Sequence, residues 1–176
     1  LELPEPEPAP EPEKFAEPEI PAIDYSSIDV SVQSEKAMAD DLKELGLFQG
    51  ASAADYALDR APTRAEAVVI LLRTLGKENE VLNAGYSHPF TDVPDWADPY
   101  IGYAYATGLS QGVSETEFGG GNASAAMYLT LVLRSLGYSD TNGEDFTWDD
   151  PYTLSEELGL LQERVDTETF LRGDIV

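Results

Sequence analysis

The sequence predicts an all-α fold built from helix-pair repeats, and three observations support that prediction. Apolar residues recur at helical spacing in several segments, for example in the run 67–72. These segments tend to begin after a capping residue and to end at a glycine, which are the start and stop signals of a helix. Short motifs also return at an interval of about 60 residues, which indicates an internal repeat.

The N-terminal segment differs from the rest, because glutamate and proline alternate along residues 1–21. Such a segment cannot bury apolar surface, and proline removes backbone donors, so we expect a charged spacer in polyproline II conformation. Residues 23–32 are expected to form a short strand or an extended strap on the domain. We therefore assign residues 1–33 to an acidic, Pro-rich linker and strap, which is an extended N-terminal tail.

The best-defined helix follows Pro62. Thr63 is a suitable N-cap, Glu66 can complete a capping box with it, and Gly76 supplies a left-handed stop. Arg64 falls in the first turn, where the helix dipole disfavours a cation by roughly 0.3–1 kcal/mol. An unfavourable residue in an otherwise consistent element is a hint of function.

Other helices are expected before and after this one. The first covers residues 34–45, with Ser34 as its cap. The second is capped by Asp95 or Asp98 and runs to Thr107, and the third covers residues 124–136. Residues 77–89 are expected to be a polar link.

The repeat is clearest in two pairs of motifs. Leu45-Gly46-Leu47-Phe48-Gln49-Gly50 corresponds to 107–112, and Leu72-Arg73-Thr74-Leu75-Gly76 corresponds to 133–137. A partial third copy follows, with Phe146-Thr147-Trp148 in its first half. One helix pair cannot bury its own apolar face, so the copies are expected to pack together. The expected units are residues 34–82, 83–140 and 141–176, the last of which is truncated.

Together these motifs resemble the S-layer homology (SLH) family over about residues 36–176. Phe90-Thr91-Asp92-Val93, Trp96-Ala97 and Gly108-Leu109 look like the first half of an SLH repeat. Pro62-Thr63-Arg64-Ala65-Glu66 looks like the signature that opens its second half. The resemblance implies three repeats in a pseudo-threefold arrangement, with central helices and loops that form prongs. The residues expected to build this fold are Thr63, Glu66, Phe90, Asp92 and Gly108.

The resemblance also implies a task, which is non-covalent attachment of a secreted bacterial protein to cell-wall polysaccharide. The usual ligand is a secondary wall glycan with acidic ketal groups, so the expected location is the cell surface. The signature arginine of the family contributes to glycan binding in grooves between prongs. Carried over to this sequence, that implies Arg64 and Arg172. The corresponding stretch 123–127 has neither arginine nor glutamate, and its groove is expected to be inactive toward an acidic ligand.

The two arginines suit an anionic sugar because a guanidinium presents paired donors to a carboxylate. Arg64 could instead pair with a neighbour such as Glu66 or Asp59.

Two tryptophans and two glycines complete the candidate glycan site. Trp96 and Trp148 occupy matching places and could stack on sugars, or they could anchor a prong in the core. Gly50 and Gly112 could let glycan approach closely, or they could be turn residues that need a positive φ.

Composition excludes several classes of partner and site. The chain has 34 acidic and 10 basic residues and a net charge of −24, which disfavours nucleic acid and anionic membranes. No run approaches the roughly 18 apolar residues of a membrane span. The absence of cysteine excludes disulfides and a cysteine nucleophile. No secretion signal is recognised, so we expect either that it was removed or that this is a segment of a longer protein.

Neither a metal site nor an active site is expected. The acidic stretch 140–145 departs from a calcium loop, because Asp145 stands where glycine is needed and Pro151 where the last ligand is needed. The single histidine, His88, is expected at the surface or in a turn. No spacing singles out a pair of carboxylates for glycosidase chemistry, so we expect neither a cofactor nor an enzyme.

The predicted function is therefore a non-catalytic module that anchors a larger surface protein to wall polysaccharide. The alternative is a structural module for protein–protein assembly in a surface layer or fibre. In that alternative, the missing helix of the third unit leaves an apolar groove that another surface-protein chain could fill.

Overall fold

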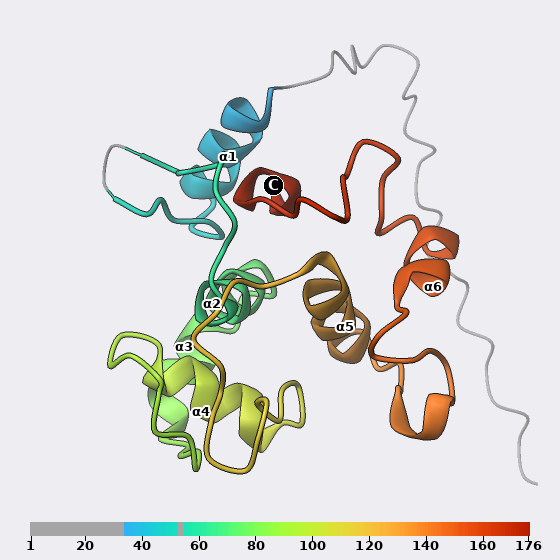
Figure 1. Ribbon diagram of the computed structural model, residues 1–176. Helices are drawn as coiled ribbons and strands as arrows, with labels where there is room; N and C mark the ends of the chain where they lie inside the picture. Colours follow the sequence, from blue (N-terminus) through green and yellow to red (C-terminus); the bar gives the residue numbers. More distant parts are fainter. Residues whose placement is uncertain (1–33, 53–54) are drawn as a thin grey trace, which may run out of the picture. The chain divides into compact units, whose positions relative to one another are not determined.

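The computed structural model describes residues 34–52 and 55–176, and this part of the chain is helical (Figure 1). It contains six α-helices and two short 3-10 segments, and within it no strand is formed, so the all-α prediction is confirmed. The helices are α1 (Glu35–Glu44), α2 (Arg64–Thr74), α3 (Glu78–Ala84), α4 (Asp98–Ala106), α5 (Ala125–Ser135) and α6 (Tyr152–Glu157). The 3-10 segments are η2 (Thr141–Gly143) and η3 (Arg172–Ile175). The tail and strap expected at 1–33 lie outside the described residues.

Local capping signals explain where the helices begin. The side chain of Ser34 accepts the N–H of Ala37 at α1, and that of Ser124 accepts the N–H of Met127 at α5. At α2 the full capping box is present between Thr63 and Glu66, as the sequence predicts. A cap of this kind stabilises a helix by about 1 kcal/mol.

Two expectations about the helices are wrong. The helix α4 begins after Ala97 with no side-chain cap, although Asp95 or Asp98 was expected there. Asp98 is the first helical residue, and its N–H donates to the carbonyl of Asp95 within the preceding turn. A backbone hydrogen bond therefore satisfies an N–H group of the first turn that a capping side chain would otherwise accept.

The expected polar link at 77–89 contains helix α3. Its one buried residue is Val81, which is 1% exposed, so the segment carries almost no apolar signal. Polar contacts hold it instead. The carboxylate of Glu78 accepts from Arg73 of α2 and from the hydroxyl of Tyr100 of α4.

The main core forms where α2 packs against α4 and α5. Nearly every residue of α2 from Ala65 to Leu72 is buried, which explains its uniformly apolar sequence. A second cluster is built on Ala39, Phe48 and Ile70, and Ile175 packs against it. The C-terminal segment η3 thereby lies against α1, as Figure 1 also shows.

The segments that lead into α2, α5 and η3 are joined by backbone hydrogen bonds. Ala123 donates to the carbonyl of Pro62 at 2.8 Å, and Arg64 donates to that of Gly121 at 3.0 Å. On the other side, Arg172 donates to the carbonyl of Arg60 at 3.0 Å. The entry to α2 therefore lies beside the entries to both other segments, and this places the two candidate arginines.

Candidate functional site

One groove of about 490 Å³ brings together three of the predicted glycan-binding residues, Arg64, Gly112 and Trp148. Its walls come from the start of α2, the loop after α4, one face of α5 and the loop before α6. Met127 and Arg134 of α5 also line the groove.

Arg64 lies at one side of this groove without a charged partner. Its Nε donates to the carbonyl of Phe118 at 3.2 Å, and its Nη1 donates to the thioether of Met127 at 3.3 Å. The guanidinium carbon lies 5.4 Å from the centre of the Phe118 ring. The expected alternative, a pair with Glu66 or Asp59, is wrong: among the described residues no carboxylate lies within 4.0 Å of Arg64.

The electrostatics of Arg64 follow from this placement. Burial lowers its pKa from the ordinary value, because desolvation penalises the cation, while the Asp92 carboxylate acts in the opposite direction. A guanidinium nevertheless keeps its charge at neutral pH. The groove therefore presents a half-buried cation that donates to one uncharged carbonyl and one weakly accepting thioether.

The loop that holds Arg64 is itself fixed by Asp92. The two carboxylate oxygens accept the N–H groups of Phe118 at 2.7 Å and Gly119 at 2.8 Å. These backbone hydrogen bonds lower the pKa of Asp92. Asp92 thus acts as a structural residue that aims the Phe118 carbonyl at Arg64.

Two features require glycine at position 112: its positive φ and the neighbouring atoms that leave no room for a side chain. Its φ is 75°, and a Cβ there would lie 2.5 Å from the Phe90 ring and 2.6 Å from the Glu117 carbonyl. The positive φ expected at Gly50 is wrong, since Gly50 is absent from the positive-φ glycines of the structure. A Cβ at Gly50 would instead meet the carbonyl of Ser52 at 2.5 Å.

Arg172 lies away from the groove, although the sequence predicts it as a second glycan ligand. It is 2% exposed, and its Nε and Nη2 donate to the carbonyls of Tyr56 at 2.9 Å and Gln49 at 3.1 Å. Its Nη1 lies 3.6 Å from Glu66 Oε1, and its guanidinium packs on the Phe48 ring. The three nitrogens and one face of the Arg172 guanidinium are therefore all in contact with other groups of the protein.

The interpretation of both tryptophans as core anchors is wrong. Trp96 is 53% exposed and Trp148 is 68% exposed, because the buried aromatic anchors of these loops are Phe90 and Phe146. Trp148 lines the groove, and Thr130 of α5 donates to its carbonyl at 3.2 Å. Trp96 lies before α4 and does not line this groove.

Arg134 is a groove residue that was not predicted. Its Nε and Nη2 bind the two oxygens of Asp140 at 2.9 and 2.6 Å, and its Nη1 donates to the carbonyl of Leu109 at 3.0 Å. The ion pair lowers the pKa of Asp140. The repeat could have revealed this residue, because Arg73 in the matching motif also pairs with a carboxylate that follows it in the chain, Glu78, through a single contact of 2.8 Å.

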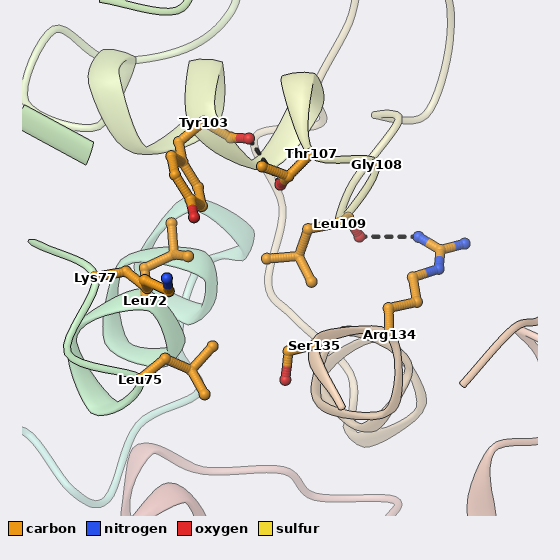
Figure 2. Close-up of a pocket in the computed structure, with 9 residues that line it drawn as sticks. All are labelled: Leu72, Leu75, Lys77, Tyr103, Thr107, Gly108, Leu109, Arg134 and Ser135. Atoms are coloured by element: carbon orange, nitrogen blue, oxygen red, sulfur yellow. Dashed lines mark hydrogen bonds between the residues drawn. The ribbon is translucent and has the colours of Figure 1, made fainter. Parts of the chain in front are cut away.

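Arg134 also borders a second, smaller cavity of about 220 Å³, shown in Figure 2. This cavity lies near the C-terminal ends of α2, α4 and α5. Its other cation, Lys77, is paired with Glu80 at 2.8 Å. Both cations of this cavity are already neutralised, so the groove at Arg64 is the better candidate for an anionic ligand.

The described residues contain no group of three or more histidine, aspartate or glutamate side chains that could hold a metal ion. His88 lies in the loop between α3 and α4, and its side chain is largely buried against Phe90, so the surface position expected as one alternative is wrong. The stretch 140–145 includes η2, and its Asp145 accepts the N–H of Ser139.

Comparison with family models finds no match for this chain. Among curated proteins it is 31% identical over 100 residues to a middle cell wall protein of Brevibacillus brevis, covering 55% of this chain and 10% of that protein. It is 32% identical over 126 residues to a cell surface protein of Thermoanaerobacter kivui, covering 68% and 16%. It is 30% identical over 100 residues to a surface layer protein of Brevibacillus choshinensis, covering 55% and 9%.

The chain thus spans 9–16% of the length of these relatives. Within residues 34–52 and 55–176, no helix has the length and apolar character needed to cross a membrane.

Proposed function

We propose that this chain is a non-catalytic, SLH-type module of a bacterial surface protein and that it binds acidic cell-wall polysaccharide in the groove at Arg64. The observation that carries the proposal is a half-buried guanidinium that has no carboxylate partner within residues 34–52 and 55–176, in a chain whose net charge is −24. Most other arginines and lysines of the described residues lie in ion pairs. The names of the relatives support a structural role at the extracellular cell surface.

Each groove residue has a distinct task in this proposal. Arg64 binds a carboxylate of the glycan, because a guanidinium presents donors that match a planar anion. Trp148 offers an exposed ring face beside it for stacking on a sugar. Gly112 keeps the groove loop in place, because its lack of a side chain leaves room for the Phe90 ring and the Glu117 carbonyl.

The overall charge of the chain shapes this binding. An anionic polymer is repelled by the acidic surface at long range and attracted by Arg64 only at short range. Added salt screens both interactions, but it screens the exposed charges more strongly than the half-buried guanidinium. We therefore expect retention on wall glycan to persist at about 0.15 M salt, unlike binding that depends on surface lysines.

The repeat units remain part of the proposal, with bounds 34–82, 83–140 and 141–176. The hydrogen bonds that join the entries to α2, α5 and η3 support a shared centre for three units. The stretch 123–127, which has no arginine of its own, lies against Arg64 from the preceding unit. A groove is thus formed by neighbouring units together.

The test is a pull-down of the 176-residue chain with purified wall glycan. We expect the wild type to be retained and Arg64→Ala to be lost, with circular dichroism showing that the variant keeps its helices. Arg164→Ala is the matched control, because Arg164 is exposed and, in the part of the chain that the structure describes, its side chain hydrogen-bonds to the neighbouring Gln162. Equal retention of Arg64→Ala and wild type would refute the site.

The alternative, a protein–protein assembly module, is favoured by leucines exposed at the ends of helices. Leu45 after α1 is 70% exposed and Leu136 after α5 is 53% exposed. A partner chain, including one that adds a helix beside η3, would cover such residues. Sedimentation equilibrium distinguishes the two functions, since a module that only binds glycan stays monomeric at micromolar concentration.

A further inference from the structure

Arg64 and Arg172 occupy corresponding positions in the fold. Each is the first residue of its helical segment, α2 or η3. Each donates from Nε to the carbonyl of an aromatic residue, Phe118 for Arg64 and Tyr56 for Arg172.

The loops that receive the two arginines also match. Ser110 donates its N–H to the carbonyl of Ala104, and Phe48 donates its N–H to that of Leu42. Positions 48 and 110, and positions 56 and 118, are therefore equivalent places in two copies of one unit.

The two arginines differ in what faces Nη1. For Arg172 it is Glu66, whose Oε1 lies 3.6 Å away. For Arg64 it is Met127, whose sulfur lies 3.3 Å away. Glu66 and Met127 are each the third residue of their helix, so one position in the repeat carries a charge in one copy and a thioether in the other.

A second difference changes the space around the cation. The Phe48 ring lies 5.3 Å from the guanidinium carbon of Arg172 and helps to bury it. The equivalent residue beside Arg64 is Ser110, which lines the groove. The small side chain leaves room for a ligand where the phenylalanine fills it.

We propose that Met127 is a specificity-determining residue: by withholding the counter-charge that Glu66 supplies to Arg172, it reserves Arg64 for a carboxylate of the ligand. A thioether is a weak acceptor without charge, so Met127 adds no counter-charge, and Arg64 feels the Asp92 carboxylate only from beyond ion-pair distance. A half-buried cation without a partner gains more from an incoming anion than one that is already paired. The ligand class is an acidic sugar, and in this respect the inference rests on the proposed function.

The decisive variants are Met127→Glu and its neutral counterpart Met127→Gln. In Met127→Glu the new carboxylate competes for Arg64, so we expect the affinity for acidic wall polysaccharide to fall at least about tenfold. Met127→Gln adds similar volume and polarity but no charge, and its affinity should stay within about threefold of wild type. A wild-type affinity for Met127→Glu, or equal losses for both variants, overturns the proposal.

A second readout needs no glycan. NMR titration of Met127→Glu should give the introduced carboxylate a pKa below the usual value for glutamate of about 4.3. The helix N-terminus also lowers this pKa, so the double variant Arg64→Gln/Met127→Glu isolates the pair. We expect the pKa to rise when Arg64 is removed, and an unchanged pKa contradicts the inference.

The two readouts separate the inference from the proposed function. If the wild type does not bind wall polysaccharide, the proposed function is wrong, and the claim that Met127 reserves Arg64 for a ligand is overturned with it. If the wild type binds and only the Met127 comparisons fail, the groove stands and the role of Met127 is overturned.

Discussion

The N-termini of α2 and α5 both follow a hydroxyl side chain that caps the helix, but they carry different residues at the third position. At α2, Glu66 accepts the N–H of the N-cap Thr63, pairs with Arg60 at 2.6 Å and lies near the buried Arg172. At α5, Met127 takes the same place and faces Arg64 without a charge. In one copy the arginine is held by contacts within the fold, and in the other we propose that it is left for recognition. On this proposal, the residue that the neighbouring unit places beside each arginine decides between the two roles.

The largest effect on stability is expected when the charge at α2 is removed. Glu66→Gln leaves the buried Arg172 without its nearest anion and weakens the pair with Arg60, and breaking such a pair costs about 3 kcal/mol. Met127→Gln, at the equivalent place in α5, removes a partly buried thioether but breaks no ion pair, so it should lower the free energy of unfolding by only about 1 kcal/mol. Urea denaturation measures both, and equal losses would remove the distinction between the two N-termini.

The same comparison predicts a pH dependence. The hydrogen bond from Arg60 and the bond from the Thr63 N–H lower the pKa of Glu66 from 4.5 to about 2. Because the folded state favours the carboxylate, its contribution is complete above about pH 4.5 and is lost as pH falls toward about 2. The stability difference between wild type and Glu66→Gln should shrink by up to about 3 kcal/mol over this interval.

The control for the pH dependence is the α5 side of the comparison. Position 127 carries no titrating group, so the difference between wild type and Met127→Gln should stay constant across the same pH interval. A difference for Glu66→Gln that is equally constant would show that Glu66 is not held in its charged form by the fold.

Substitution of a glycine should destabilise the protein more at position 112, where the loop is tightly packed, than at the open position 120. Gly112→Ala forces a positive φ on alanine and places a methyl group against Phe90, so we expect a loss of about 2 kcal/mol together with weaker glycan binding. Gly120→Ala in the same loop region is the control, since a Cβ there meets nothing within 4 Å. Thermal unfolding followed by circular dichroism compares the two.

The smallest effects on stability are expected at the two tryptophans. Both side chains are mostly exposed, so Trp96→Ala and Trp148→Ala should each change the free energy of unfolding by less than about 0.5 kcal/mol. Only Trp148 lines the groove, and only its variant should weaken retention on wall glycan. Equal retention of the two variants would remove Trp148 from the site.

The helices could be predicted from the sequence because their signals are local. Ser34, Thr63 and Ser124 cap the helices that follow them, and each cap is read within four residues of chain. Helix α3 escaped prediction because its stability comes from contacts of Glu78 with α2 and α4, which no local pattern encodes.

The site was predictable only in part, for a related reason. Arg64 stands out in its own helix as an unfavourably placed cation. The roles of Met127 and Ser110 depend on which segments lie side by side, and they follow only once Arg64 is seen against α5. The exposure of Trp148 depends likewise on Phe146 having taken the buried place in its loop.

The most direct test replaces each of the two arginines separately and measures both the affinity for glycan and the stability of each variant. Arg64→Gln should abolish binding of acidic wall polysaccharide in a titration while the urea midpoint stays near that of wild type. Arg172→Gln should lower the urea midpoint and, below that midpoint, leave the affinity of the folded protein within about threefold of wild type. Wild-type affinity in Arg64→Gln, or a loss of binding in well-folded Arg172→Gln, would contradict the division of roles between the two residues.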